Sequence, residues 1–411
     1  MKLVFSMTLA LALLASAPAL AWGGHGDQGD KIDVMTQNQY LGADLNPIIA
    51  APDPVAFNAA LIDALQQIAA NNYPARARKL AQLIAFRRPE LVGLQEMFQF
   101  VCYETGFPGA VANACQLPSI SGAFNDHLHE TLRDLKKLGK RYNAAAIVDN
   151  LDLTATLPGL LTPGLPVFLN DDPIPDITVT VLDRDVILAR GDIVDSVDPV
   201  SFPCTKPSAD GCNYTTVASV EDTPIGDIFI ERGFVGVDAT VDGKQYRFVN
   251  THLEVQEPDG TEASSIVQAA QAAELIGVLG LTTPPDRSLI VVGDINSSSE
   301  DPLIPGPWPF PPPFDQAIIP PYALLVAAGY TDAWTELPYP RPGFTCCQES
   351  DLSNKYSILD ERIDVIFSAD APDSVRRGRV LGATLWSKTW STWPKPLWPS
   401  DHGSVAAELE F

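Results

Sequence analysis

The stretch Leu397-Trp398-Pro399-Ser400-Asp401-His402-Gly403-Ser404 leads into the last apolar run of the chain, Ser404 to Leu409. A polar Ser-Asp-His triplet directly before a buried strand predicts a reactive turn at the edge of a sheet. The triplet alone also fits a nucleophilic serine beside a histidine. Its chemistry therefore depends on the residues that end the other strands.

Several apolar runs elsewhere in the chain end on polar residues in the same way. Strands are predicted over Lys31 to Asn38, which alternates in polarity, over Pro89 to Glu96 and over Ser288 to Asp294. A buried polar group costs free energy unless it is paired, so one such residue means little, but several on different strands favour one shared site. The residues collected in this way are Asn38, Glu96, Asn250, His252, Asp294, Asn296, Asp364, Asp401 and His402.

The residue types in this set indicate a particular chemistry. Carboxylate and amide oxygens are hard ligands that suit Mg²⁺, with Mn²⁺ or Ca²⁺ as alternatives. The two histidines can move protons near neutral pH. A hard divalent metal combined with acid-base histidines is typical of phosphoester hydrolysis.

The order of elements predicts a layered α/β fold. Closely spaced strand signals at Phe234 to Val241 and Tyr246 to His252 flank Asp242-Gly243, which is typical of a hairpin turn and implies antiparallel pairing. Apolar periodicity predicts the other elements. Helices are expected over 55–70, 74–86, 126–140 and 262–279, and strands over 142–148, 185–190, 228–230, 362–367 and 404–409.

These strand ends resemble, in order, the motifs of the endonuclease/exonuclease/phosphatase superfamily, which has a deoxyribonuclease I-like fold. The resemblance covers residues 31 to 411. It rests on Asn38, Leu94-Gln95-Glu96, Asn250-Thr251-His252-Leu253, Gly293-Asp294-Ile295-Asn296, Arg362-Ile363-Asp364 and Ser400-Asp401-His402. The resemblance implies a four-layer α/β/β/α sandwich, in which two mixed, largely antiparallel sheets lie face to face with helices outside.

The resemblance also implies roles for individual residues. Glu96 is expected to be the principal metal ligand, supported by Asn38 and Asp401. Asp294 and Asn296 are expected to hold the attacking water and the phosphate. His252 is expected to bind phosphate or to protonate the leaving oxygen. Asp364 is expected to orient His402, and either His402 or Asp294 is the general base.

Substrate contacts are predicted at Asn250 of this set and at two arginines outside it. Arg190 and Arg232 are candidates for contact with phosphate, although structural pairing of the two arginines fits as well. Many nuclease members carry an aspartate two residues after the first motif asparagine, where this chain has Tyr40. The Asn38 to Leu41 segment instead resembles some sphingomyelinase-like members.

Four tryptophans precede Asp401, and Trp398 is the nearest of them. The others are Trp386, Trp390 and Trp393. Indole rings can stack on bases, lie at a lipid interface or pack a loop. With a proline-broken apolar segment at 151–176, they favour a phosphodiesterase acting on a lipid-type or small phosphoester, with a lipid head group at a membrane surface as a candidate partner. The alternatives are an extracellular nuclease and a catalytically silent binding protein.

The chain is strongly acidic, with 51 acidic and 27 basic residues and a formal net charge of −24. An anionic surface opposes polyanions, because non-specific nucleic-acid binding depends on Lys and Arg displacing counterions from phosphates. Acidity therefore disfavours DNA or RNA as a partner, although it also serves simply to keep a protein soluble. A monomer is expected.

The first residues predict export. Lys2, an apolar run from Leu3 to Ala15 and the small residues Ala19 and Ala21 are typical of a signal peptide over 1–21, cleaved near Ala21, so the protein is expected to be extracellular or periplasmic. No later segment is expected to cross a bilayer. A flexible segment at 22–30 should precede a single catalytic domain at 31–411, with insertions near 98–120, 151–176, 191–222 and 301–321.

Cysteine usage agrees with an oxidising compartment. The spacing favours local bridges between Cys102 and Cys115 and between Cys204 and Cys212, and no C-x-x-C zinc spacing is present. The adjacent Cys346 and Cys347 could pair with each other or elsewhere.

Overall fold

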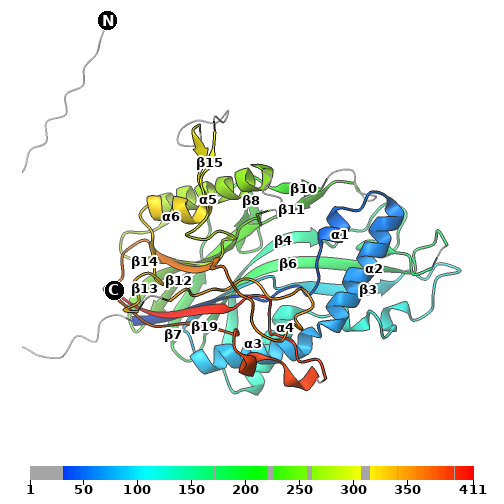
Figure 1. Ribbon diagram of the computed structural model, residues 1–411, viewed down its shortest axis with the longest axis horizontal. Helices are drawn as coiled ribbons and strands as arrows, with labels where there is room; N and C mark the ends of the chain where they lie inside the picture. The colour runs from blue at the N-terminus through cyan, green and yellow to red at the C-terminus, as the bar shows by residue number, and fades with distance from the viewer. Residues whose placement is uncertain are drawn as a thin grey trace, which may run out of the picture.

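Two mixed β-sheets of eight strands each lie face to face in the computed structural model (Figure 1). The structure describes residues 31–411 except 171, 221–225, 257–261, 307–314, 340 and 393. The predicted signal peptide and the 22–30 segment lie outside the described residues, as do Trp393 and the centre of the proline-rich 301–321 segment. The predicted fold class is confirmed.

The first sheet has the strand order β19-β20-β1-β2-β6-β3, and β4 and β5 also pair with β6. β1 runs parallel to β2 and antiparallel to β20, so the last strand lies directly beside the first strand (Figure 1). Its strands are β1 (Lys31–Asn38), β2 (Leu91–Gln95), β3 (Gln99–Glu104), β4 (Tyr142–Leu153), β5 (Leu165–Val167), β6 (Ile177–Arg190), β19 (Ser374–Leu381) and β20 (Ser404–Glu410).

The second sheet has the order β17-β18-β14-β13-β12-β9-β8, and β7 also pairs with β12. β13 and β14 are parallel, while β12 and β13 form the predicted hairpin, in which Asp242 (φ 49°) and Gly243 (φ 81°) make the turn. Its strands are β7 (Val194–Pro199), β8 (Lys206–Ser208), β9 (Gly211–Asn213), β12 (Gly233–Val241), β13 (Lys244–His252), β14 (Ser288–Asp294), β17 (Thr331–Asp332) and β18 (Asp364–Ser368).

Two short ribbons lie outside these sheets. They are formed by β10 (Ala218–Val220) with β11 (Ile228–Ile230), and by β15 (Ile304–Pro305) with β16 (Ala317–Ile318).

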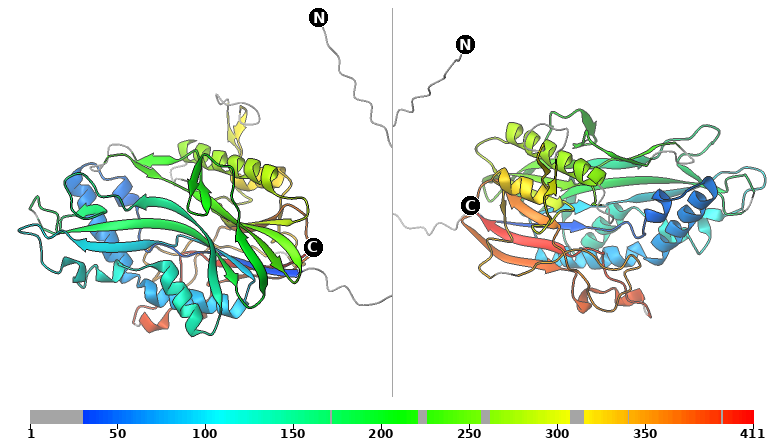
Figure 2. Two further views of the ribbon diagram at one scale, coloured as in Figure 1. Left: turned by 180° about the vertical axis from the view of Figure 1, so that it is seen from behind. Right: turned by 45° about the horizontal axis from the view of Figure 1, so that its top comes forward.

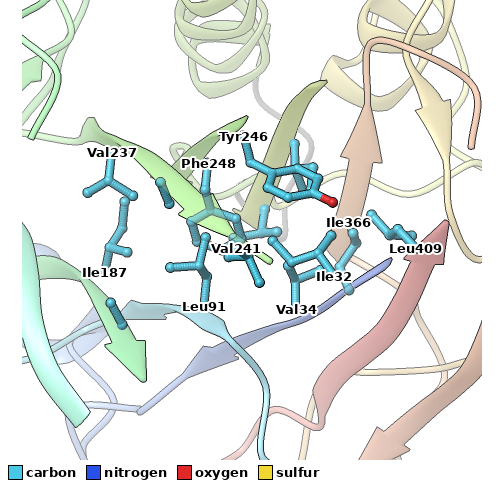
Figure 3. Packing of buried hydrophobic residues seen from close by; sticks show 14 of the residues in the cluster. Ile32, Val34, Leu91, Ile187, Val237, Val241, Tyr246, Phe248, Ile366 and Leu409 are labelled. Atoms are coloured by element: carbon cyan, nitrogen blue, oxygen red, sulfur yellow. The ribbon is translucent and has the colours of Figure 1, made fainter. Parts of the chain in front are cut away.

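The central core fills the space between the two sheets (Figure 3). β-Branched and aromatic side chains dominate it, as alternation along half-buried strands predicts. Ile32 and Val34 of β1 face Tyr246 and Phe248 of β13, and all four side chains are fully buried. Burial on both faces fixes the register, since a slip of one residue would turn each inner face outward.

Helices cover both outer faces of the sandwich, with α5 and α6 on one side and α2, α3 and α4 on the other (Figure 2). Their starts follow local chemistry: the Asp53 side chain accepts from the Ala56 N–H to cap α2, and Pro54 occupies its first turn. The helices are α1 (Asn46–Ile49), α2 (Pro54–Ala70), α3 (Tyr73–Arg87), α4 (His127–Lys137), α5 (Glu262–Thr282) and α6 (Pro321–Ala327).

Several segments differ from their predicted structure. The predicted insertions near 98–120 and 191–222 contain strands of the main sheets, β3 in the first sheet and β7, β8 and β9 in the second. The strand predicted over 185–190 begins at Ile177, because apolar residues on both sides of Asp183-Arg184-Asp185 form one long β6. The 151–176 segment is not entirely an exposed loop: β4 extends to Leu153, and Leu165 and Val167 of β5 are buried against β6. The prolines left enough backbone free for this short edge pairing.

The expectation that no later segment is long and apolar enough to cross a bilayer does not hold for α5. Ala263–Thr282 is long and apolar enough to span a membrane, by length and composition alone. In the fold, Ala272, Leu275 and Leu279 of this helix are fully buried in the cluster formed with the second sheet. Packing against the sheet accounts for these apolar residues of α5.

Three disulfides join all the cysteines of the chain. Cys102 pairs with Cys115, Cys204 pairs with Cys212, and Cys346 pairs with its neighbour Cys347. The first two are the predicted local bridges. The third shows that the adjacent cysteines pair with each other, which the sequence had left open.

Candidate active site

The strand pairing explains why the predicted polar residues meet. The carboxyl ends of the parallel pairs β1-β2 and β13-β14 reach one end of the sandwich, and the register places His252 beside Asp294. β18 and β20 run antiparallel to their neighbours, so their first residues reach the same end, where Asp294 pairs with Asp364. Asp401 and His402 directly precede β20.

Asn38 links the two sheets at this end. Its Nδ2 donates to Glu96 Oε1 and to Asp294 Oδ2, both at 3.0 Å, and its Oδ1 accepts from the Tyr40 N–H at 2.9 Å. The second carboxylate oxygen of Glu96 accepts from the Leu41 N–H at 2.8 Å. Glu96 and Asp294 therefore hold fixed positions relative to each other.

His402 lies between two carboxylates. Its Nδ1 hydrogen-bonds Asp364 Oδ2 at 2.8 Å, and its Nε2 is 3.7 Å from Asp294 Oδ2. Burial lowers the pKa of this imidazole, but the carboxylates of Asp364 and Asp294 outweigh burial and raise it well above its usual value. Burial also raises the pKa of Asp294 to about 7, against the opposing effect of His402. The bond to Asp364 fixes the ring so that Nε2 faces Asp294.

His252 approaches the same Asp294 oxygen from another strand, with its Nε2 at 3.7 Å. Its Nδ1 lies 3.1 Å from Arg232, and burial and this guanidinium hold its pKa well below the usual value. Since a nitrogen facing a guanidinium must accept, Nε2 carries the proton. His252 is therefore a neutral donor directed at Asp294.

Three residues of this cluster have a strained backbone conformation. Tyr40 (φ 58°), Glu96 (φ 57°) and Asn296 (φ 48°) all adopt the left-handed conformation without being glycine. Residues in such conformations persist where surrounding contacts hold them, and they gather at functional sites. Gly293 (φ 154°) is required for another reason: a Cβ there would collide with the backbone of Thr251.

Ser400 serves as a hydrogen-bonding support. Its hydroxyl donates to the Asn38 carbonyl at 2.8 Å and accepts from the His402 N–H at 3.1 Å. Both contacts fix the turn that carries Asp401 and His402. Asn296 is anchored in a similar way, because its N–H donates to Asp294 Oδ1 at 3.0 Å and its side chain donates to the Leu253 carbonyl at 2.9 Å.

Three predicted contact residues serve the scaffold instead. Asn250 is fully buried, and its amide bonds Gln95 and the carbonyls of β2 and β6, which leaves it no path to a substrate. Arg190 lies at the opposite end of β6, where it pairs with Glu90 at 2.7 Å. Trp398 is 1% exposed and donates to the Asn354 carbonyl. Sequence patterns did not reveal these partners because they come from distant segments.

Arg232, in contrast, lies in the site. Besides His252, it faces Asp183 at 3.9 Å and Glu254 at 3.7 Å. Neither carboxylate was predicted from the sequence. Asp183 interrupts the apolar run of β6, which is the signal that could have identified it, whereas Glu254 follows β13 without a distinguishing pattern.

Arg76 of α3 was also missed. It is fully buried, and its guanidinium donates to the carbonyls of Gln39, Tyr40 and Pro399 at 2.8–3.1 Å. It thereby joins the loop after β1 to the turn before His402.

The donor set fits a hard divalent cation. Glu96, Asp183, Glu254 and Asp401 line one cavity, together with a single arginine, Arg232. Burial raises the pKa of Asp183 to about 7 and that of Asp401 to about 6, and Glu96 adds to both shifts. The buried atoms Asp183 Oδ1 and Glu254 Oε2 have no hydrogen-bond partner. A cation would offset this concentration of negative charge.

The expected metal ligands Glu96 and Asp401 are not, however, among the described side chains that lie close enough together to chelate a metal directly. Among the described residues, the close groups of His, Cys, Asp and Glu are Asp294-Asp364-His402 and Cys346-Cys347-His402. Glu96 and Asp401 therefore depend on Asn38 or on water to complete a coordination shell.

An apolar cavity of about 440 Å³ opens on the carboxylates. Its walls are side chains such as Phe57, Leu61, Leu65, Phe98 and Val179, while Glu96, Asp183, Arg232 and Asp401 form its polar end.

The profile of the Endonuclease/Exonuclease/phosphatase family matches residues 55–402, which contain all but the first of the motifs. The chain belongs to this family. No curated protein matches the sequence.

Solved structures of the family show distant similarity. A family protein from Leptotrichia buccalis shares 13% identity at a TM-score of 0.47, with 92% of this chain and 100% of that chain covered. Truncated TDP2 from Caenorhabditis elegans shares 13% identity at 0.42, with 93% and 98% covered. The mannosyl-6-phosphatase of Bacteroides thetaiotaomicron shares 17% identity at 0.45, with 92% and 100% covered.

Proposed function

We propose that this protein is a divalent-metal-dependent phosphodiesterase that hydrolyses a lipid-type phosphoester by attack of water. The observation that carries the proposal is the continuous set of contacts from Asp364 through His402, Asp294 and Asn38 to Glu96. These contacts connect His402 and Asp294, which can transfer protons, to the Glu96 carboxylate, which can bind a hard metal ion, and they extend across both sheets. Family membership supports hydrolysis of phosphoester bonds.

Glu96 and Asp401, supported by Asn38, would hold the cation. When bound, a divalent ion supplies charge neutralisation for the phosphoryl oxygens. Mg²⁺ is the ion that we propose, and Mn²⁺ or Ca²⁺ would suit the same oxygen ligands.

The side chains of the site supply the remaining steps. Asp294 Oδ2 takes a proton from the attacking water, because it is the acceptor toward which Asn38 and both histidines converge. Nε2 of His402 and Nε2 of His252 donate to the phosphoryl and leaving oxygens, where negative charge develops. Asp364 positions His402 without touching substrate.

The apolar cavity beside the carboxylates supports a lipid-type substrate, since its walls suit hydrocarbon rather than a hydrogen-bonding base or sugar. The net charge of −24 supports the same choice over nucleic acid. Export after cleavage near Ala21 and a monomeric state remain predictions.

Purified protein with Mg²⁺, Mn²⁺ or Ca²⁺ should be assayed against lysophosphatidylcholine, sphingomyelin, a generic phosphodiester, plasmid DNA and RNA. We expect turnover of a lipid-type ester, and we expect EDTA and His402→Ala to abolish it. Full turnover in either control would contradict the mechanism. Preferential cleavage of DNA or RNA would instead make the protein a nuclease, and no turnover of any substrate would identify a binding protein.

A further inference from the structure

The 440 Å³ cavity beside the active site has two chemically different ends. Phe57, Leu61 and Leu65 of α2 form part of its apolar wall, together with Leu165 of β5, Val179 of β6 and Phe98 in the connection between β2 and β3. All six side chains are buried within the fold. Its volume lies in the range of small-molecule sites.

The polar end of the cavity is the candidate active site itself. Glu96 and Asp401 line the cavity together with Asp183 and Arg232. A molecule that occupies the whole cavity must therefore be amphiphilic, with a charged group at the carboxylates and hydrocarbon along the wall. A base or sugar placed against this wall would lose its hydrogen bonds to water without replacement.

Exposed apolar residues continue the wall to the protein surface. Ile49 of α1 and Val255 after β13 line the cavity and are 44% and 42% exposed. Ile228 and Ile230 of β11 line it as well. An alkyl chain would enter the cavity past the exposed residues Ile49 and Val255.

We propose that the cavity binds the alkyl chain of a single-chain amphiphilic phosphoester, with its phosphate at Glu96 and Asp401. This inference rests on the proposed function and names the substrate class of the same site. One chamber accommodates one chain, so the ligand is an individual single-chain molecule rather than a two-chain lipid held in a bilayer. Burial of each methylene supplies affinity that grows with chain length.

Calorimetric titration of wild-type protein with ethyl, hexyl and decyl phosphonate, in Mg²⁺, tests the proposal without turnover, because hydrolysis does not cleave the carbon–phosphorus bond. We expect Kd to fall about two- to fourfold for each added methylene until the cavity is filled. A Kd that does not change with chain length would overturn the proposal.

Ala64 of α2 offers a variant for the same titration. It lines the cavity and is 3% exposed, whereas Ala59 on the same helix is exposed to solvent. We expect Ala64→Leu, or Ala64→Phe if it folds, to weaken decyl phosphonate binding at least tenfold more than ethyl phosphonate binding. Ala59→Leu should change neither Kd. Equal effects of the two leucine variants would contradict the assignment.

A sedimentation assay with vesicles distinguishes a free single-chain phosphoester from a phospholipid held in a bilayer. Sedimentation with phosphatidylcholine vesicles containing phosphatidic acid should leave the protein in the supernatant while decyl phosphonate binds. Sedimentation with vesicles but no phosphonate binding would overturn the single-chain proposal. If Kd depends on alkyl-chain length but no ester is hydrolysed, the proposed hydrolysis is refuted and the alkyl-chain site is supported. If an ester is hydrolysed but Kd does not depend on alkyl-chain length, the alkyl-chain site is refuted and the proposed hydrolysis is supported.

Discussion

Asp364 contacts His402 Nδ1 at 2.8 Å, and the positioning role that we propose for it can be separated from a purely structural role. The Asp364→Asn change keeps the shape of the side chain but can present an N–H to His402 Nδ1, which would favour the wrong ring tautomer. We expect kcat to fall by about a hundredfold or more while KM changes less than threefold. Steady-state kinetics on the substrate found above provides the measurement.

Asp373→Asn, an exposed aspartate before β19, is the matched control and should leave kcat unchanged. A further test is Asp364→Glu, which should recover part of the lost kcat because it restores a carboxylate acceptor. If Asp364→Asn raised KM and left kcat intact, the side chain would bind substrate instead of orienting His402.

Arg76 presents a second test at the level of one residue. Arg76→Met removes the side-chain donors of four backbone carbonyls, which include those of Gln39, Tyr40 and Pro399 around the site. We expect the free energy of unfolding to fall by about 3 kcal/mol or more, as measured by urea denaturation. Arg78→Met on the exposed face of the same helix should cost less than about 0.5 kcal/mol. Similar losses in both variants would show that Arg76 contributes only helix propensity.

Position along a strand is the signal by which the sequence placed several residues together. Asn38, Glu96, Asp294 and His402 were selected because each ends or begins an apolar run, and contacts of 3.0–3.7 Å join them in the fold. Asn250 carries the same signal, but its partners lie on β2 and β6, in the opposite sheet. A strand end therefore predicts location at the site, and only the packing decides between catalysis and support.

At the scale of elements, β1 is joined to α3 by a buried ion pair. Asp33 Oδ1 lies 2.8 Å from Arg87 Nε, and Asp33 is 7% exposed. Burial, opposed by Arg87, raises the pKa of Asp33 to about 7. The folded protein therefore binds more protons here than the unfolded chain between the unfolded pKa near 4 and pH 7.

This pair gives stability a defined pH dependence. Because the folded pKa is the higher one, the contribution of Asp33 to the free energy of unfolding should decrease as pH rises from about 4 to 7, by at most roughly 1.4 kcal/mol per unit. The difference between wild type and Asp33→Asn, measured by urea unfolding at pH 5 and pH 8, should follow this trend. A difference that increases with pH would show that Asp33 is ionised throughout and bound to Arg87.

Element boundaries were predictable where one periodicity dominated. β1 and β14 begin and end as predicted, since both are continuous and bounded by turn residues. β6 was predicted too short because Asp183-Arg184-Asp185 looks like a loop, yet Arg232 faces Asp183 and Asn150 bonds Asp185. These partners lie on other elements, so the sequence around Asp183 to Asp185 gave no signal of them.

At the scale of the whole molecule, repulsion among the buried carboxylates predicts a response to metal. We expect Mg²⁺ at saturating concentration to raise Tm by several degrees relative to EDTA, because the ion binds only the folded state. Glu96→Gln should remove most of this increase, and the exposed Glu336→Gln should retain it. An unchanged Tm with Mg²⁺, Mn²⁺ and Ca²⁺ would contradict the metal site. Thermal unfolding followed by circular dichroism gives the measurement.

The pairing of β20 with β1 has a consequence for the time at which activity arises. The site needs Asn38 from the first strand and His402 from the turn before the last strand, and these two strands are neighbours. No nascent chain that stops short of residue 402 carries the complete set of groups. Hydrolytic activity therefore cannot begin before the segment through β20 has been synthesised, and its onset depends on the closure of the sheet by β20.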